Sequence, residues 1–224
     1  MKSIVILALF AFALSSNVIM VGDSRTYLLV QYLFNFGYGY NVIETVAPLP
    51  YPKDTKKHMF RFDCMPGARI YEFQSNQPLG IFLDQLLATS PGSYAFLWVG
   101  INNVASQQGI IDTFHKYVEL AQKFPGVQFI VFSIPGVDET KSCHYHPATN
   151  AWIRLYNDYM KTHVTAIRAY YPNIRYGSFV DEARPWITVD GVDITPFLDE
   201  QGLHFNAEAC KYFLDKMMQF LPDN

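Results

Sequence analysis

The feature that most constrains this chain is a serine between a buried strand and a helix. The residues from Asn17 to Val21 predict a short buried β-strand, and those from Arg25 to Phe36 have the pattern of an amphipathic helix. Gly22-Asp23-Ser24 turns the chain between them. Open α/β sheets bind ligands at the carboxyl ends of their strands, and a helix N-terminus favours negative charge. Ser24 is therefore well placed for a nucleophile, although a serine that only caps the helix would give the same pattern.

Strand-like and helical segments alternate along the rest of the chain. The predicted strands are continuous apolar runs, which indicates a parallel sheet covered on both faces. Repeated β–α units with right-handed crossovers give three layers. We therefore predict one α/β domain with a central, mostly parallel sheet. The expected strands are Val18–Val21, Val42–Val46, Tyr94–Val99, Val127–Ser133 and Ile174–Phe179, and the expected helices are Thr26–Phe36, Leu79–Thr89, Ile110–Phe124, Trp152–Tyr171 and Asn206–Leu221.

The balance of charge excludes one class of partner. Half of the 224 residues are hydrophobic and 17% are charged, which suits one folded domain with a sizeable core. The net charge is −3, and no run of basic residues is present. We therefore expect no nucleic-acid partner.

The first sixteen residues have the pattern of a secretory signal peptide. Met1-Lys2-Ser3 carries one positive charge, eleven apolar residues follow from Ile4 to Leu14, and two serines come next. Eleven apolar residues are too few to span a bilayer as a helix, so no stable membrane anchor is expected. An additional N-terminal strand is the alternative. We predict a signal peptide at residues 1–16, a domain at residues 17–224, and a secreted or extracytoplasmic protein.

Three cysteines are too few for a disulfide scaffold. In a secreted protein Cys64 and Cys143 are the pair to test, because both lie in predicted loops beside candidate site segments. Cys210 lies in an apolar helix, where a buried thiol is expected. Cys143-His144-Tyr145-His146 fits no standard zinc spacing, so no metal site is expected.

Three later segments follow the serine in a fixed order. They are Met65-Pro66-Gly67-Ala68, Gly100-Ile101-Asn102-Asn103 and Leu203-His204-Phe205-Asn206. Together with Gly22-Asp23-Ser24 they resemble the sequence blocks of the SGNH hydrolases, also called GDSL-type, a group of esterases and lipases. The resemblance covers nearly the whole predicted domain. It implies a flavodoxin-like, three-layer α/β/α fold and ester chemistry without a cofactor.

The resemblance implies a role for one residue in each block. Ser24 would be the nucleophile, and His204 the base that takes its proton and later returns it to the leaving alcohol. The oxyanion hole would combine the backbone N–H groups of Ser24 and Gly67 with the side-chain amide of Asn102. A turn glycine, an Asx-turn asparagine and a helix-capping histidine are the simpler interpretations of the last three blocks.

The most serious departure from the family pattern concerns the acid. The family has an aspartate three residues before the histidine, where this chain has Gln201. A glutamine can accept a hydrogen bond from imidazole but brings no charge, and in serine proteases that loss costs about 10⁴ in rate. We expect a Ser–His dyad, oriented by Gln201 or by a backbone carbonyl. A carboxylate displaced to Asp199 or Glu200 is the second alternative, and a pocket that has lost catalysis is the third.

Arg25 directly follows the predicted nucleophile. A solvated arginine in the first helical turn is the simplest interpretation. A pair with Asp23, or with an acidic part of the substrate, is the alternative.

These features together predict a secreted serine esterase that forms an acyl-enzyme on Ser24. The resemblance implies small-molecule, carbohydrate or lipid esters, either O-acetyl groups on carbohydrate or short acyl esters of lipid, and the sequence does not choose between them. An acyltransferase on the same fold is one alternative. The other is a catalytically inactive glycan-binding or surface protein. This alternative stays open because Gln201 stands where the family has an aspartate.

Overall fold

A six-stranded sheet lies at the centre of the computed structural model, which describes residues 17–35, 47–48, 59–141, 149–178, 188–189, 192–193 and 195–222. The strand order is β2-β3-β1-β4-β5-β6. The five neighbouring strands β3, β1, β4, β5 and β6 are parallel to one another. The edge strand β2 is antiparallel to β3. These strands are β1 (Asn17–Gly22), β2 (Ala47–Pro48), β3 (Met59–Cys64), β4 (Tyr94–Trp98), β5 (Gln128–Phe132) and β6 (Ile174–Gly177), and a separate pair comprises β7 (Thr188–Val189) and β8 (Val192–Asp193).

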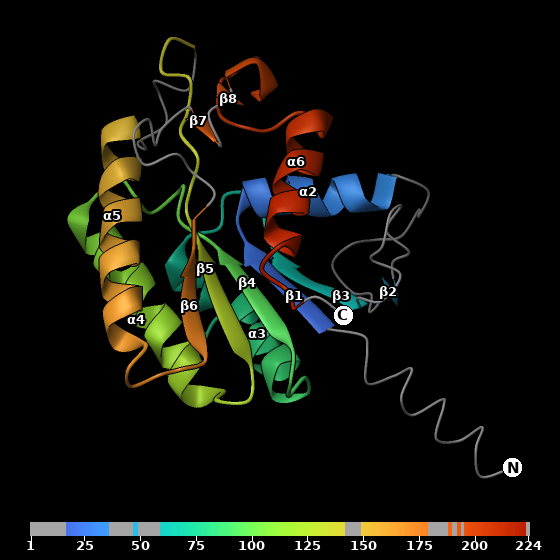
Figure 1. The fold of residues 1–224 in the computed structure, drawn as a ribbon, viewed down its shortest axis with the longest axis vertical. Helices are drawn as coiled ribbons and strands as arrows, with labels where there is room; N and C mark the ends of the chain where they lie inside the picture. The colour runs from blue at the N-terminus through green and yellow to red at the C-terminus, as the bar shows by residue number, and fades with distance from the viewer. Residues whose placement is uncertain are drawn as a thin grey trace, which may run out of the picture.

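Helices cover both faces of the sheet (Figure 1). Two helices pack against each other on one face, and three cover the other. The sheet between these layers forms the core, and the side chains from Val18 to Val21 are at most 1% exposed. The predicted three-layer α/β/α fold with a mostly parallel sheet is therefore confirmed. The helices on the first face are α2 (Ser24–Asn35) and α6 (Ala207–Met218), and those on the second are α3 (Pro78–Ala88), α4 (Gln107–Lys123) and α5 (Asn150–Ile167). The described residues also include the short 3₁₀ helices η1 (Ile70–Phe73) and η3 (Thr195–Phe197).

One central strand was not predicted from the sequence. β3 pairs in parallel with β1 along its whole length, from Met59 to Cys64. Arg61 and Asp63 interrupt its apolar run, yet Asp63 is only 2% exposed. The predicted strand Val42–Val46 and the predicted signal peptide at residues 1–16 lie outside the described residues.

Asp63 is a buried carboxyl group whose Oδ2 has no hydrogen-bond partner among the residues that the structure describes. Burial raises the pKa of this side chain to about 7. In the unfolded chain the pKa of an aspartate is about 3.9. The folded protein therefore keeps a proton in this interval that the unfolded chain has lost. Stability should fall as the pH rises through the interval and level off above it, by on the order of 4 kcal/mol in total.

Asp63→Asn tests this dependence, because the amide has nearly the same size and does not titrate. We expect the free energy of unfolding of the variant, relative to the wild type, to be higher at about pH 8 than at about pH 5. Urea denaturation at the two pH values measures it. A difference between the two proteins that is the same at both pH values would contradict this interpretation.

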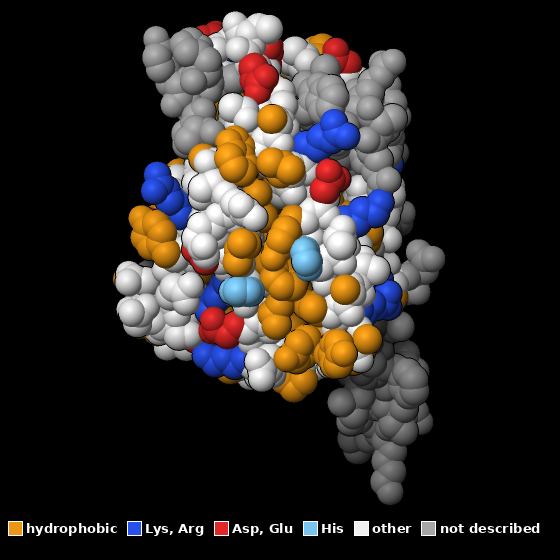
Figure 2. Space-filling view, turned by 90° about the vertical axis from the view of Figure 1, so that its left-hand side faces the viewer, with side chains coloured by type: hydrophobic (Ala, Val, Ile, Leu, Met, Phe, Trp, Pro, Cys, Tyr) orange, Lys and Arg blue, Asp and Glu red, His pale blue; other side chains and the backbone are white. Residues whose placement is uncertain are grey.

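His115 on α4 and His163 on α5 lie close to neighbouring aromatic rings. The ring of Phe114 lies 6.0 Å from that of His115 and 5.5 Å from that of His163, and the Tyr159 ring lies 4.0 Å from His163. Figure 2 shows histidine side chains beside a band of hydrophobic ones on one face of the molecule. The contact of Phe114 with His163 joins α4 to α5, whereas His115 is exposed.

Cys64 and Cys210 are buried free thiols. Burial raises the pKa of Cys210 to about 12 and also raises that of Cys64, so neither favours the reactive thiolate. Cys143, the predicted partner of Cys64, lies outside the described residues together with His144 and His146. Among the residues that the structure describes, no helix combines the length and apolar character needed to cross a membrane.

Candidate active site

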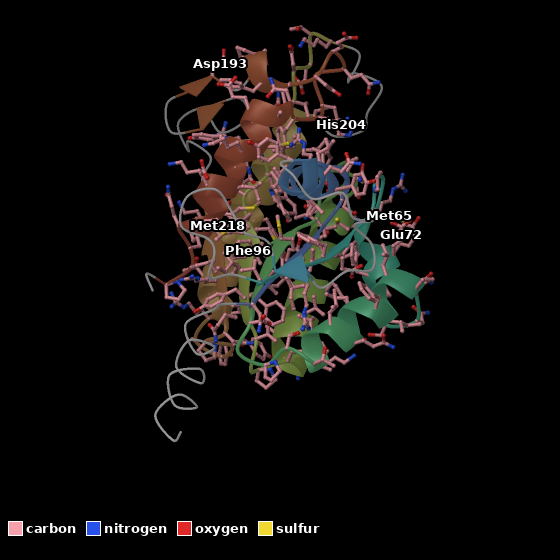
Figure 3. The ribbon with its side chains drawn as sticks, turned by 90° about the vertical axis from the view of Figure 1, so that its right-hand side faces the viewer. Met65, Glu72, Phe96, Asp193, His204 and Met218 are labelled. Atoms are coloured by element: carbon pink, nitrogen blue, oxygen red, sulfur yellow. The ribbon has the colours of Figure 1, made fainter. Side chains whose placement is uncertain are left out.

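Ser24 and His204 meet at the edge of the sheet where β1 ends. Ser24 is the first residue of α2 and is half-buried. Its Oγ lies 3.1 Å from Nε2 of His204, although the two residues are 180 positions apart. Figure 3 shows His204 beside α2, with Phe96 in the sheet below it. The fold therefore brings together the two residues that the sequence predicts as nucleophile and base.

The other ring nitrogen of His204 faces a carboxylate. Nδ1 of His204 lies 3.2 Å from Oδ2 of Asp199. The second oxygen of Asp199 accepts hydrogen bonds from the backbone N–H groups of Leu203 and His204, at 3.0 and 3.2 Å. Burial by itself raises the pKa of Asp199, but these N–H groups and the facing imidazole lower it overall. Asp199 is thus a charged carboxylate at neutral pH, held against the imidazole.

Gln201 does not occupy this position, which corrects the arrangement expected first from the sequence. The chain turns between Asp199 and His204, and the N–H of Gly202 donates to the Asp199 carbonyl at 2.9 Å. Gly202 has a positive φ of 74°, and an added Cβ would lie 2.7 Å from the Asp138 carbonyl oxygen, so this turn requires glycine. Gln201 is exposed in the turn. The residue beside the imidazole is therefore five positions before it, not three.

Asp23 joins the serine turn to the segment that carries Asn102. Its side chain is 1% exposed, and Oδ1 accepts the backbone N–H of Arg25 at 3.0 Å. Oδ2 accepts the N–H groups of Gly100 and Ile101, at 3.1 and 3.2 Å. Burial raises the pKa of Asp23, and the backbone hydrogen bonds and Arg25 oppose that shift. The sequence did not predict this link between the ends of β1 and β4.

Gly67 lies in a tight turn beside the end of β1. The N–H of Ala68 donates to the Met65 carbonyl at 3.1 Å, and Gly67 has a φ of 77°. A positive φ at the third position, after a proline, is the geometry of a type II turn. The N–H of Met65 donates to the carbonyl of Gly22 at 3.3 Å, so the turn is fixed to the strand that precedes Ser24.

Asn102 holds the same turn from the other side. Its Nδ2 donates to the carbonyl of Ala68 at 3.0 Å, and Oδ1 of Asn103 accepts the N–H of Ile70 at 2.9 Å. The two asparagines thus join the segment after β4 to the residues that follow Gly67. The three predicted oxyanion donors, on Ser24, Gly67 and Asn102, come from segments that are hydrogen-bonded to one another directly or through Asp23.

Arg25 is buried, so the prediction that its side chain is solvated is wrong. Its side chain is 1% exposed. Nε and Nη2 donate to the Leu203 carbonyl at 3.0 and 2.8 Å, Nη2 also donates to the Gly136 carbonyl at 2.9 Å, and Nη1 donates to the Pro135 carbonyl. The guanidinium lies over the Phe205 ring, 4.7 Å from its centroid. The chain after β5 and the segment before α6 cover this helical turn and exclude water from it.

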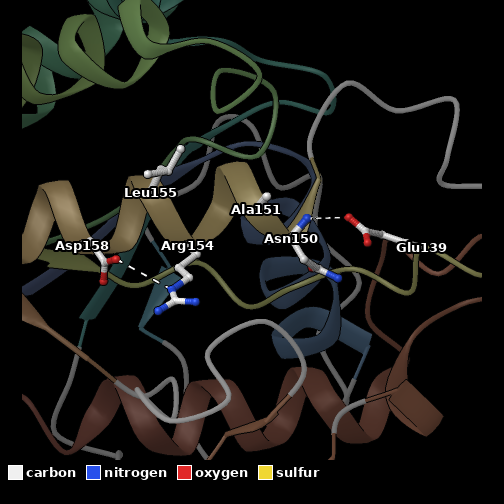
Figure 4. A pocket seen from close by; sticks show the side chains of 6 residues that line it. All are labelled: Glu139, Asn150, Ala151, Arg154, Leu155 and Asp158. Carbon is white, nitrogen blue, oxygen red and sulfur yellow. Dashed lines mark hydrogen bonds and ion pairs between the residues drawn. The ribbon is translucent and has the colours of Figure 1, made fainter.

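A separate hollow of about 590 Å³ lies at the N-terminal end of α5 (Figure 4). Its lining includes none of the residues that meet around His204. Within the described ranges, no group of three or more His, Cys, Asp or Glu side chains is arranged to hold a metal ion. The lining residues of the hollow are Glu139, Asn150, Ala151, Arg154, Leu155 and Asp158.

No family model matches this chain, and no curated protein matches its sequence. Solved structures match its fold. A protein proposed to be an SGNH hydrolase, from Slackia heliotrinireducens, aligns with a TM-score of 0.62 at 10% identity, over 92% of this chain and 98% of that one. A protein of the G-D-S-L family proposed to be lipolytic, from Desulfitobacterium hafniense DCB-2, aligns with a TM-score of 0.60 at 12% identity, over 92% and 100%.

The C-terminal catalytic domain of peptidoglycan O-acetyltransferase A from Streptococcus pneumoniae also aligns, with a TM-score of 0.51 at 13% identity over 92% of each chain. At these identities the likeness concerns the fold. The resemblance to SGNH hydrolases in the sequence is confirmed at that level: the chain has the fold of the SGNH/GDSL hydrolases.

Proposed function

We propose that this chain, a domain with the SGNH/GDSL hydrolase fold, is a serine esterase that acts through an acyl-enzyme on Ser24. One observation carries the proposal. Ser24 Oγ lies 3.1 Å from His204 Nε2, and His204 Nδ1 lies 3.2 Å from Asp199 Oδ2. A hydroxyl, an imidazole and a carboxylate in this order form the arrangement that activates serine nucleophiles.

In the proposed first step His204 takes the proton of Ser24 Oγ while that oxygen attacks the ester carbonyl carbon. Asp199 stabilises the imidazolium that forms. His204 then gives the proton to the leaving alcohol, and the acyl group stays on Ser24 as an ester. A water molecule, deprotonated by His204 in the same way, attacks this ester. The bond between Ser24 Oγ and the acyl carbon breaks, His204 returns the proton to Ser24 Oγ, and the carboxylic acid leaves.

The oxyanion of each step would be held by the N–H groups of Ser24 and Gly67 and by the amide of Asn102. The hydrogen-bonded connection between Asn102 and the Gly67 turn supports this assignment. An added Cβ at Gly67 would meet no atom within 4 Å, so the turn borders open space that a substrate can enter.

Asn102→Ala tests the proposed oxyanion hole. We expect kcat to fall by about 10²–10³, because one donor to the developing charge is lost. We expect KM to change little, because that donor acts mainly in the transition state. Steady-state kinetics measures both constants, and Asn76→Ala, at an exposed asparagine, is the matched control. An unchanged kcat in Asn102→Ala would contradict the assignment.

The proposed substrates are carboxylic esters, either O-acetyl groups on carbohydrate or short acyl esters of lipid. The fold is shared with proteins described as lipolytic and as an O-acetyltransferase. An acyltransferase therefore remains the alternative within this chemistry. Asp199 beside His204 supports an active site over the inactive pocket, the alternative that was based on Gln201. The signal-like pattern of residues 1–16 supports an extracytoplasmic location as part of the proposal.

The test is acetate release from p-nitrophenyl acetate and from an O-acetylated oligosaccharide by the purified protein, with and without an acceptor oligosaccharide. Hydrolysis in the absence of acceptor supports the esterase. Acetyl transfer that exceeds hydrolysis when acceptor is present would assign an acyltransferase instead. A folded protein that catalyses neither hydrolysis nor acetyl transfer would rule out both the esterase and the acyltransferase.

A further inference from the structure

Arg25 is the neighbour of Ser24 in the sequence, and its side chain contacts the segment that carries His204. Nε and Nη2 donate to the carbonyl of Leu203, the residue before His204, at 3.0 and 2.8 Å. The guanidinium also lies 4.7 Å from the ring centroid of Phe205, the residue after His204. One side chain therefore holds both neighbours of the proposed base.

The segment from Leu198 to Phe205 is closed by its own hydrogen bonds. Leu198 and Phe205 form an antiparallel bridge, and the N–H of Asp199 donates to the carbonyl of His204 at 2.7 Å. The Asp199 carboxylate accepts two N–H groups of the same segment and faces its imidazole. These contacts fix His204 relative to Asp199, but none of them fixes either residue relative to Ser24.

The guanidinium is itself held from a second side. It donates to the carbonyls of Pro135 and Gly136, in the chain that follows β5. A guanidinium is a planar group with five N–H donors, and it can bond carbonyls on two edges at once in a fixed geometry. Phe205, below it, stacks on Trp98 with ring centroids 5.8 Å apart and an interplanar angle of 14°. Arg25 is thus a rigid connection between the first turn of α2, the chain after β5 and the His204 segment.

We infer that Arg25 is a positioning residue, which sets the distance between Ser24 Oγ and His204 Nε2 by docking the preformed His204–Asp199 segment on α2. The inference rests on the proposed esterase function. Arg25 touches neither the hydroxyl nor the imidazole in the contacts described above, and it acts through Leu203 and Phe205. A displacement of about 1 Å in a catalytic pair can cost about 10² in rate, so the reaction depends on this connection.

Arg25→Lys is the variant that tests the inference, because lysine keeps the positive charge and loses the planar fork. We expect kcat for ester hydrolysis to fall by about 10- to 100-fold while KM changes by less than about twofold. A purely structural role would lower the melting temperature and leave kcat per folded molecule unchanged. Arg175→Lys is the matched control, because Arg175 also donates to a backbone carbonyl, that of Phe220 just past the C-terminal end of α6. We expect it to keep the wild-type kcat.

A crystal structure of Arg25→Lys gives a readout that does not need activity. We expect Ser24 Oγ and His204 Nε2 to separate beyond hydrogen-bond range, while the contact between His204 and Asp199 stays. An unchanged Ser24–His204 distance would overturn the inference, whether or not the wild type hydrolyses esters. A wild type without activity would instead reject the proposed function, and the distance would still decide the role of Arg25.

Phe205→Leu provides a second test if Arg25→Lys does not fold. It removes the ring under the guanidinium and keeps the hydrogen bonds of Arg25 and an apolar side chain. We expect a smaller effect of the same kind as in Arg25→Lys, with kcat lower by about 3- to 10-fold and KM unchanged. A folded Phe205→Leu protein with wild-type kcat would overturn the inference.

Discussion

Ser24→Ala is expected to lower kcat for ester hydrolysis by about 10⁶-fold. The alanine removes the oxygen that would carry the acyl group, so the acyl-enzyme cannot form. Residues that act as one unit are not additive, so Ser24→Ala combined with His204→Ala should be no slower than Ser24→Ala alone. Measurement of kcat for the two single variants and the double variant checks both statements.

Ser75→Ala is the matched control, since Ser75 is an exposed serine in a turn. We expect it to keep the wild-type kcat. Ser24 is half-buried at the start of α2, so circular dichroism should show the same helix content in Ser24→Ala as in the wild type. If purified Ser24→Ala hydrolysed esters at the wild-type rate, another residue would be the nucleophile.

Asp199→Asn is expected to lower kcat by about 10⁴-fold. The asparagine keeps an oxygen that can accept the N–H groups of Leu203 and His204, so the turn should persist. It lacks the charge that stabilises the imidazolium and no longer selects the imidazole tautomer that can take the serine proton. The effect should therefore appear in kcat, measured on folded protein, with little change in the melting temperature.

Gln201→Ala decides between the two candidate orienting residues. Gln201 is exposed in the turn, so we expect its replacement to change kcat by less than about twofold, within the range of ordinary surface substitutions. The reverse result, with Gln201→Ala slow and Asp199→Asn near the wild-type rate, would restore the glutamine-assisted dyad that the sequence suggests.

The sequence is sufficient to predict most of the fold because the apolar runs that mark its strands are the buried ones. β1, β4 and β5 are recognisable for this reason. β3 is not, because Arg61 and Asp63 lie within it and burial of a charged group depends on tertiary packing. The pairing of β3 with β1 is a long-range contact that no local pattern encodes.

Some residues of the candidate site can likewise be predicted from the sequence, and others depend on the folded structure. Ser24, Gly67, Asn102 and His204 lie in motifs that can be recognised one by one. Asp199 cannot be chosen over Gln201 by spacing alone, because the choice depends on the turn at Gly202 and its positive φ.

The structural roles of Arg25 and Asp23 could not be predicted, for a related reason. The partners of the Arg25 side chain are the carbonyls of Pro135, Gly136 and Leu203, which are more than 100 positions away along the chain. Backbone groups carry no sequence signature of their own. A charged side chain directly beside a predicted nucleophile was the one available signal for both residues.

The central claim, that Ser24 is activated by His204, is tested most directly by reaction of the purified protein with a fluorophosphonate, followed by mass spectrometry of its peptides. We expect one phosphonyl group on Ser24 in the wild type and in Gln201→Ala, a much slower reaction in Asp199→Asn, and none in His204→Ala. A folded wild type that forms no adduct, or a His204→Ala variant that reacts as fast as the wild type, would contradict it.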